Sequence, residues 1–420
     1  MSSNKKQKNW RYITTFTLMV VVLMLSFGAC GRKQEKPVVQ LSLWASDQDQ
    51  EIMEEMAATF AELYADEAEL EITICEESES TCMETVMLCP EAAADVYVFA
   101  DDQLPELARG GALLPVSEYK EQVISDNGGI DASAVAAASY KGTLYAYPLT
   151  ASNGYFLYYN ADYFSDEDVK SLETILSVAA KNHRKFGMEI TSGWYLYGFF
   201  KGAGLDVYEN EDGVTNTCEW NNLDTTNGKY RGVDVAQALI DMVDSDGFVN
   251  VTNDDFIAGV QSETIIAGIS GTWNTKFMQE SFGDGYRAAK LPTYVVAGDE
   301  LQMHSVAGYK LVGINAYTKE KEWSQRLAMW ITNEENQLLR FEKRGECPSN
   351  VHAASSEEVQ QTEAIAALAK QSEFGHQQIV ANCYWNAAYR FGNVIASGNI
   401  GSRDLQELLD EMVESASRED

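Results

Sequence analysis

The sequence predicts an α/β protein made of two doubly wound lobes that are joined by crossover hinge segments. Segments that alternate as strands are followed by segments with helical spacing of apolar residues, the order typical of parallel α/β sheets. This order occurs in two successive sets along the chain. The chain has 420 residues, beyond the length at which a single core stops growing, so we expect two lobes.

The first set begins at Val38. Val38 to Trp44 alternates as a strand does, whereas Asp47 to Tyr64 places its apolar residues at helical spacing. The other elements predicted in this set are the strands Leu70 to Cys75 and Asp95 to Phe99, and the helices Ser80 to Leu88 and Leu104 to Arg109. Gly110 and Gly111 stop the last of these helices.

Two extended, aromatic-rich segments, Leu144 to Pro148 and Tyr155 to Asn160, flank Thr150 to Gly154, which we interpret as a crossover between lobes. The second set comprises helices Leu172 to Lys181, Tyr195 to Phe200 and Val233 to Asp244, and strands Thr264 to Ile269 and Arg287 to Leu291. After it come a strand, Lys310 to Ile314, and helices Trp323 to Thr332, Ile365 to Lys370, Ala387 to Ala396 and Leu405 to Val413.

Each lobe is expected to be built from two separate segments of the chain. The N-terminal lobe is expected to contain residues 38–151 and 303–348, and the C-terminal lobe residues 152–302 and 349–420. Open α/β sheets bind their ligands beyond the carboxyl ends of the strands, so polar and aromatic residues at these positions are the candidate site.

The first thirty residues indicate an export signal. A basic start is followed by a fifteen-residue apolar stretch, shorter than the roughly 20 residues that span a bilayer, and then by Gly28-Ala29-Cys30. This ending resembles a lipobox, so we expect removal of residues 1–29, a diacylglyceryl group on Cys30 and a tether over 30–37. The protein would then lie on the extracellular face of the cytoplasmic membrane. A transmembrane helix is the second interpretation.

Composition excludes several classes. The formal charge of −33 becomes about −37 when the four basic residues of the signal are removed, so nucleic acid is not an expected partner. With 45% hydrophobic residues and 21 Tyr, 16 Phe and 8 Trp, the chain is not disordered. Six cysteines besides Cys30 leave both disulfides and free thiols open.

Motifs of common enzyme classes are absent from the sequence. It contains no G-x-S-x-G, H-E-x-x-H, Walker loop or G-x-G-x-x-G, and its four histidines are isolated from one another. We therefore predict no catalytic residue, no metal and no cofactor. A glycosidase needs only two carboxylates, however, and 64 acidic residues leave that class open.

Aromatic residues with polar neighbours follow several of the predicted strands. A sugar ring has a flat C–H face and a hydroxyl rim, which suits an aromatic wall beside carboxylate and amide groups. Trp273 and Trp385 stand among turn and polar residues, so we interpret them as ligand platforms rather than core.

Five segments in a fixed order carry a resemblance to a known family. They are DVYVFADDQLPELARGGALLPV (95–116), YKGTLYAYPLTASNGYFLYYN (140–160), SGTW (270–273), VAGYKLVGINAYTKEKE (306–322) and CYWNAAYRFGNVIASG (383–398). Together they resemble the maltose/maltodextrin-binding proteins, extracellular solute-binding proteins that feed ABC importers. The resemblance covers nearly all of the chain after the signal.

The resemblance implies a ligand site at matching positions. Its residues would be polar contacts after the first strand (Asp47, Gln48), an aromatic and a carboxylate after the third (Phe99, Asp102), aromatic platforms with a neighbour (Trp194, Tyr195, Trp273, Trp385) and a rim contact (Tyr389). Two further positions depart from the family. Gln103 stands where an arginine is usual, and Asn153 stands near a usual glutamate.

The resemblance also implies a function. We expect a lipid-anchored, monomeric, non-enzymatic receptor that closes on a maltodextrin-type oligosaccharide and delivers it to ABC permease subunits. Three alternatives stay open: a receptor for another oligosaccharide, a cell-surface glycoside hydrolase or transferase, and a structural lipoprotein with an inactive cleft.

Overall fold

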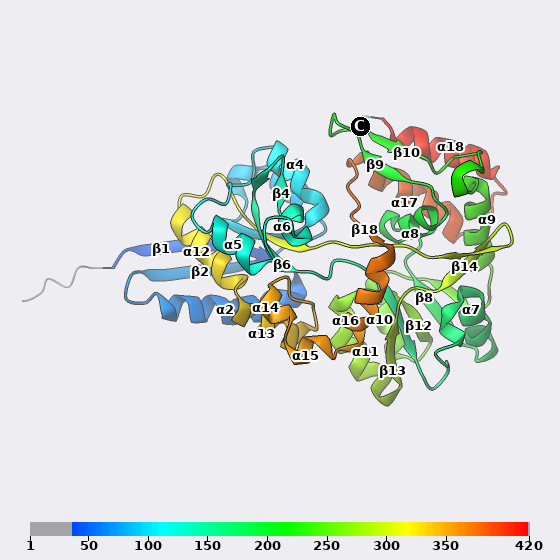
Figure 1. Cartoon of the computed structure of the whole chain (residues 1–420), viewed down its shortest axis with the longest axis horizontal. Helices are drawn as coiled ribbons and strands as arrows, with labels where there is room; N and C mark the ends of the chain where they lie inside the picture. The colour runs from blue at the N-terminus through cyan, green and yellow to red at the C-terminus, as the bar shows by residue number, and fades with distance from the viewer. Residues whose placement is uncertain (1–35, 419–420) are drawn as a thin grey trace, which may run out of the picture. The chain divides into compact units, whose positions relative to one another are not determined.

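The computed structural model describes residues 36–418 (Figure 1). Within this range the contacts separate a small unit, residues 36–39 with 61–71, from a large unit of residues 40–60 and 72–418. The small unit contains the end of one helix and the starts of two strands, so the features below belong mainly to the large unit.

The first set of elements contains the expected strands and helices. Their bounds are β1 Val38–Ala45, α2 Gln50–Leu63, β2 Glu69–Glu76, α3 Cys82–Leu88, β3 Val96–Ala100, α4 Leu104–Arg109, α5 Lys120–Asp126, α6 Ser133–Ala137, β4 Ser139–Tyr140, β5 Thr143–Leu144 and β6 Ala146–Thr150. Short 3₁₀ turns, Asp47–Asp49 and Asp101–Gln103, follow β1 and β3.

The second set follows directly after β6. Its strands are β7 Phe156–Asn160, β8 Lys185–Met188, β9 Val207–Glu209, β10 Asn216–Cys218, β11 Phe248–Asn250, β12 Ile265–Ser270, β13 Tyr286–Ala289, β14 Thr293–Val296 and β15 Asp299–Gln302. Its helices are α7 Leu172–Lys181, α8 Gly193–Gly202, α9 Gly232–Val243, α10 Asn253–Gln261 and α11 Thr275–Phe282.

The last part of the chain contributes to both sheets and adds most of the remaining helices. Its strands are β16 Ser305–Val306, β17 Lys310–Ile314 and β18 Gly375–His376. Its helices are α12 Lys321–Ile331, α13 Glu334–Arg344, α14 Val351–Ala354, α15 Glu357–Gln360, α16 Glu363–Gln371, α17 Cys383–Ala396 and α18 Leu405–Ala416.

Two five-stranded sheets organise these elements and confirm the two-lobed α/β class. The first has the order β2-β1-β3-β17-β6, and the second has the order β11-β8-β12-β7-β13. Helices α3 and α12 pack on the first sheet, and α7, α10 and α16 on the second. Residues 151–155 lead from β6 in the first sheet to β7 in the second, as the sequence predicted.

The expectation of purely parallel sheets is wrong for one strand in each. Strand β17 runs antiparallel to β3 and β6, and β7 runs antiparallel to β12 and β13. Both strands are entered directly from a crossover between the sheets. They therefore escape the β-α-β connection that makes neighbouring strands parallel.

Both faces of the second sheet are buried. Leu157 and Tyr159 of β7, with Tyr155 just before it, belong to one hydrophobic cluster, whereas Phe156 and Tyr158 belong to another. Successive strand residues point to opposite faces, so this division places apolar packing on each side of the sheet. This burial explains why the segment reads as a continuous aromatic run rather than as an alternating one.

Helix α13 is an element that the sequence reading missed. Asn333 caps its start by accepting a hydrogen bond from the Asn336 amide at 2.8 Å, and Gly345 ends it with a left-handed φ of 74°. Its buried residues are Asn336, Gln337 and Arg340. Because this inward face is polar, the helix lacks the apolar periodicity by which helices are recognised.

Candidate functional site

Polar residues of the candidate site lie at one edge of the first sheet. The 3₁₀ turn Asp101–Gln103 follows the carboxyl end of β3, and Asn153 follows β6. The amide of Asp101 donates to the Tyr309 carbonyl at 3.0 Å, and that of Asn153 donates to the Gly308 carbonyl at 3.1 Å. Segments far apart in sequence are thus held together where this fold class keeps its ligand.

Aromatic residues lie at the matching edge of the second sheet. Trp194 opens α8, and Trp273 lies in a 3₁₀ turn that follows β12. Their rings meet edge to face, with centroids 6.3 Å apart and an interplanar angle of 62°. Gly271 lets the Trp273 ring approach the backbone, because a Cβ at this glycine would lie 2.0 Å from the ring. This packing fixes the orientation of the two indoles.

A narrow cavity brings residues of both edges together. It is lined by Asp101, Asp102, Asn153, Trp194, Val306, Ala307, Gln378 and Trp385. A second, larger cavity of about 350 Å³ shares Asp101, Asn153, Val306 and Ala307 with it and extends along the crossover residues. We call the two together the crossover cavity.

Several buried polar atoms at the crossover cavity have no hydrogen-bond partner within the described residues. They are Asp102 Oδ1, Trp194 Nε1, Gln378 Nε2 and Ser152 Oγ. Buried polar groups are normally paired, so these atoms are available to a polar ligand. Two indole walls and four free polar atoms match the mixed surface of a sugar.

Two neighbouring carboxyl groups at this cavity have raised pKa values. Burial raises the pKa of Asp101 to about 7, and the charge of Asp102 adds to the rise, while hydrogen bonds from Gln377 and Asn153 oppose it. Burial likewise raises the pKa of Asp102 to about 6. Asp101 accepts a hydrogen bond from Gln377 Nε2 at 3.2 Å.

Four of the residues expected at the site, Asp102, Asn153, Trp194 and Trp385, line the crossover cavity. Trp273 does not line the cavity, but its ring packs edge to face against Trp194, which does. Tyr195 lies beside a smaller pocket with Glu189 and Ser270, and its ring packs 4.9 Å from Tyr155. Tyr389 is 58% exposed on α17 and does not line the crossover cavity.

Two of the expected site residues are used by the fold instead. Phe99 lies inside β3 with no exposed area and packs against Tyr97, so it belongs to the core. Gln103 is buried, accepts a hydrogen bond from the Met83 amide at 2.9 Å and donates one to the Glu79 carbonyl at 2.6 Å. Neither side chain lines the crossover cavity.

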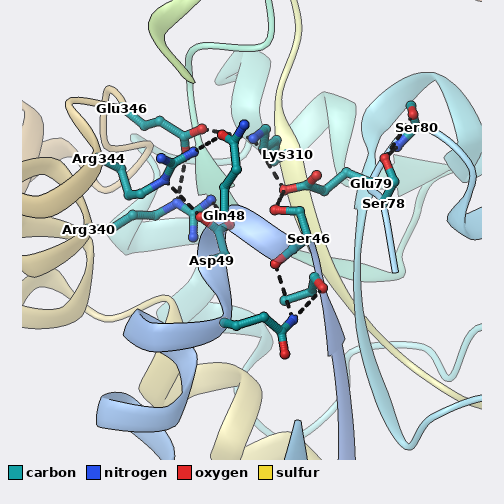
Figure 2. Close-up of polar contacts among 12 residues, drawn as sticks. Ser46, Gln48, Asp49, Ser78, Glu79, Ser80, Lys310, Arg340, Arg344 and Glu346 are labelled. Atoms are coloured by element: carbon teal, nitrogen blue, oxygen red, sulfur yellow. Dashed lines mark hydrogen bonds and ion pairs between the residues drawn. The ribbon is translucent and has the colours of Figure 1, made fainter. Parts of the chain in front are cut away.

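Asp47 and Gln48 lie after β1, exposed and away from the crossover cavity. Gln48 accepts a hydrogen bond from Arg344. It lies at the margin of a buried ionic cluster formed by Asp49, Glu79, Lys310, Arg340, Arg344 and Glu346 (Figure 2). The polar turn after the first strand is therefore engaged in this ionic cluster.

The ionic cluster compensates its buried charges. Arg340 contacts Asp49 and also bonds Glu346 at 2.7 Å, and Lys310 bonds Glu346 at 2.8 Å. Burial alone would raise the pKa of Glu346, but Arg340, Lys310 and Arg344 lower it well below its usual range. The three acids and three bases balance, as buried charges require. Glu346 precedes Cys347, whose carbonyl accepts from the Ala151 amide at 2.9 Å, so the cluster anchors a crossover segment.

The expected site residues did not include Asp101, Ser152, Gln377 and Gln378. Asp101 stands next to the expected Asp102 in a quoted motif, so the doubled carboxylate was a usable signal. The two glutamines lie in an irregular segment near β18, where nothing in the local sequence marks them. Only the tertiary structure brings them to the cavity.

A histidine pair joins two strands beside the crossover. His304 Nδ1 and His376 Nε2 are 2.8 Å apart, and their rings stack with centroids 5.0 Å apart. The two residues lie at the paired strands β16 and β18. Burial lowers the pKa of His304 to about 4, with further contributions from the charges of His376 and Lys201. Burial, followed by Lys201, also lowers the pKa of His376.

Other expectations concern cysteines, metals and the membrane. None of the six cysteines in residues 36–418 forms a disulfide. Across that range the structure shows no group of three or more His, Cys, Asp or Glu side chains placed to hold a metal ion. No helix in the described part of the chain has both the length and the apolar character needed to cross a bilayer. Cys30 lies outside the described residues.

Two α/β lobes with a partly apolar, partly polar cavity at the crossover define a solute-binding protein of the two-lobed class. The model of the family described as bacterial extracellular solute-binding protein matches residues 55–367. The chain belongs to this family, which confirms the predicted class of non-enzymatic binding protein.

Curated relatives are similar over most of their length. The galactooligosaccharide-binding protein of Bacillus subtilis is 23% identical over 95% of this chain and 95% of its own. A maltooligosaccharide ABC transporter solute-binding lipoprotein of Streptococcus pneumoniae is 25% identical, with 88% of this chain and 87% of its own covered.

Solved structures agree with the fold. One described as being with acarbose has a TM-score of 0.79 and 28% identity, covering 90% of this chain and 98% of its own. The maltotriose-binding protein of Thermus thermophilus, solved with maltotriose, has a TM-score of 0.74 at 19% identity, covering 90% of this chain and 98% of its own. The second likeness bears on the fold alone.

Proposed function

We propose that this protein is the substrate-binding component of a carbohydrate ABC importer and holds a maltodextrin-type oligosaccharide in the crossover cavity. The observation that carries the proposal is the cavity wall itself, where Trp194 and Trp385 lie among unpartnered polar atoms of Asp102 and Gln378. Indole faces cover the C–H face of a sugar ring, and the polar atoms take its hydroxyl groups.

The mechanism is ligand-driven closure of the two lobes. The predicted lobes, 38–151 with 303–348 and 152–302 with 349–420, would move about the crossover segments. Closure is favoured only to the extent that the sugar binds the closed state more tightly than the open one. The closed, loaded form would then deliver the sugar to permease subunits.

A lipid anchor on Cys30 would keep the monomeric receptor beside its permease, on the extracellular face of the membrane. Support comes from the lipobox-like ending of the signal and from the pneumococcal relative, whose name describes a solute-binding lipoprotein. One lipid-modified cysteine with two acyl chains anchors a protein stably, whereas one chain is marginal.

A galactooligosaccharide is the second candidate ligand. It is favoured by the Bacillus subtilis relative, which matches over 95% of both chains. Asn153, which lines the crossover cavity near a position where maltodextrin-binding proteins usually have a glutamate, is also compatible with a different sugar.

Calorimetric titration of the purified protein with maltotriose, cellotriose and β-galactotriose tests the proposal and separates the two candidates. We expect micromolar affinity, about −8 kcal/mol, for one α-glucan or galactan and no release of products by chromatography. Turnover of the sugar, or no binding to any of the three, would contradict the proposal.

Replacing Trp385 by alanine tests the aromatic wall directly. Because the indole lines the cavity, we expect Trp385→Ala to weaken sugar binding by roughly 1–3 kcal/mol while the thermal midpoint changes little. Tyr208→Ala removes an aromatic ring that is 50% exposed on β9 and serves as the control. If Trp385→Ala lowers stability strongly and leaves affinity intact, the ring is part of the core.

A further inference from the structure

The carboxyl groups of Asp101 and Asp102 at the crossover cavity have no basic partner among the described residues, unlike the other buried acids discussed above. Asp49 and Glu346 have side chains without exposed area, and each is bonded to at least one arginine or lysine (Figure 2). Asp101 is 4% exposed and Asp102 is largely buried, yet no ion pair of the described residues includes either. Buried charges are normally paired, so the exception indicates a missing partner.

The wall of the cavity supplies no cation of its own. Among the described residues that line the crossover cavity there is no lysine, arginine or histidine, and Tyr309 is the one titratable group besides the two aspartates. The hydrogen bonds to Asp101 come from neutral donors, including Gln377 Nε2 at 3.2 Å. Gln103 carries no charge and is already bonded to Met83 and Glu79.

Buried polar atoms beside the pair point to a ligand. Gln378 is only 3% exposed and lines the same cavity, and its unpartnered Nε2 can donate to a hydroxyl oxygen of a ligand. Asp102 Oδ1 is an unpartnered acceptor beside it. We propose that the pair Asp101 and Asp102 selects an oligosaccharide that carries a primary ammonium group, an amino sugar, over its neutral counterpart. This inference rests on the proposed function and specifies the ligand of that same site.

A sugar ammonium group fits the wall better than a metal ion does. Calcium takes six to eight oxygen ligands, whereas the cavity wall has two carboxylates, and no third acidic, histidine or cysteine side chain of the described residues is placed with them to hold a metal ion. An ammonium group needs only a few acceptors, and charge-assisted hydrogen bonds are roughly twice as strong as neutral ones. The indole faces also favour a nearby cation.

Matched pairs of trisaccharides test the inference. Maltotriose is compared with maltotriose that carries a primary amine in place of one 6-hydroxyl, prepared for each ring, and cellotriose with the glucosamine trimer. At pH 7.5 we expect the amino member of one pair to bind about tenfold or more tightly than its neutral partner. The advantage should shrink at pH 5.5, because Asp101, with a pKa of about 7, is then largely protonated in the free protein.

Variants assign the effect to the aspartates. Asp101→Asn and Asp102→Asn should each reduce the preference for the amine while leaving neutral-sugar binding measurable, which also shows that the variants fold. Glu54→Gln removes an exposed carboxylate of α2 and should leave the preference unchanged. A titration with calcium chloride alone tests whether the site binds a metal ion instead of an amine.

The outcomes separate the inference from the function on which it rests. A preference for the amine that Asp101→Asn abolishes supports the inference. Equal or weaker binding of every amine, with neutral sugar bound, overturns the inference and leaves the proposed function standing. Micromolar calcium binding also overturns the inference. If no trisaccharide binds, both are wrong.

Discussion

Arg340→Met is the change that tests the ionic cluster most directly. The Arg340 side chain is 1% exposed and contacts both Asp49 and Glu346, whose side chains have no exposed area. Methionine keeps much of the volume but leaves three acids against two bases. Arg344 still bonds Asp49 at 3.0 Å, and Lys310 still bonds Glu346, so part of the compensation survives.

The size of the effect follows from burial. Removing one partner of a buried pair typically destabilises a protein by about 3–5 kcal/mol, since the remaining charge is left uncompensated. We expect the lower end of this range, because each acid keeps one base. Urea unfolding followed by circular dichroism measures the loss in the transition that contains the first sheet.

The matched control is Arg403→Met, which removes an exposed ion pair with Glu411 and should cost about 0–1 kcal/mol. Adding Glu346→Gln to Arg340→Met should recover part of the lost stability, because the orphaned charge is removed as well. A loss for Arg340→Met no larger than that of the control would refute the reasoning.

Two further predictions concern protonation and the membrane. The lowered pKa values of His304 and His376 mean that the unfolded chain binds more protons than the folded chain below about pH 6.5, so stability should fall as the pH drops toward 4. The pair is half-exposed and screened by solvent, so the effect is modest: His304→Gln should remove on the order of 1 kcal/mol of the stability that the protein loses in acid. Thermal melts across this pH range measure it. If the variant has the same pH profile as the parent protein, the pair does not titrate on unfolding. Cys30→Ser should release the protein from the membrane fraction into the medium, whereas Cys75→Ser should not; retention of the Cys30 variant would favour a transmembrane helix.

Local patterns predicted those elements whose inward face is apolar. Residues 172–181 and 233–244 have apolar residues at helical spacing, and α7 and α9 form there within a residue of the expected bounds. Helix α13 escaped because it buries Gln337 and Arg340, a polar face that periodicity cannot reveal. Local patterns also failed to predict the antiparallel direction of β7 and β17, because strand direction depends on how the chain returns to a sheet.

Some residues of the candidate site could likewise be predicted from the sequence, and others could not. Asp102, Trp194 and Trp385 could be selected from sequence, because polar or aromatic residues that follow strands or open helices mark the ligand edge of an α/β sheet. Phe99 carried the same signal but lies one position inside β3, where the strand's fully buried pattern places it in the core. A shift of one residue decides whether a side chain faces a ligand or the interior.

The sequence by itself determined the α/β class, the two lobes and the resemblance to solute-binding proteins, because these depend on periodicity and on motifs that are local in the chain. Only the tertiary structure decided which charges are compensated. Asp49 meets Arg340 and Asp101 meets Gln377 across more than 270 positions of sequence, so no local pattern could show that the first acid is paired and the second is not. That difference, set by long-range packing, gives the crossover cavity its uncompensated carboxyl groups.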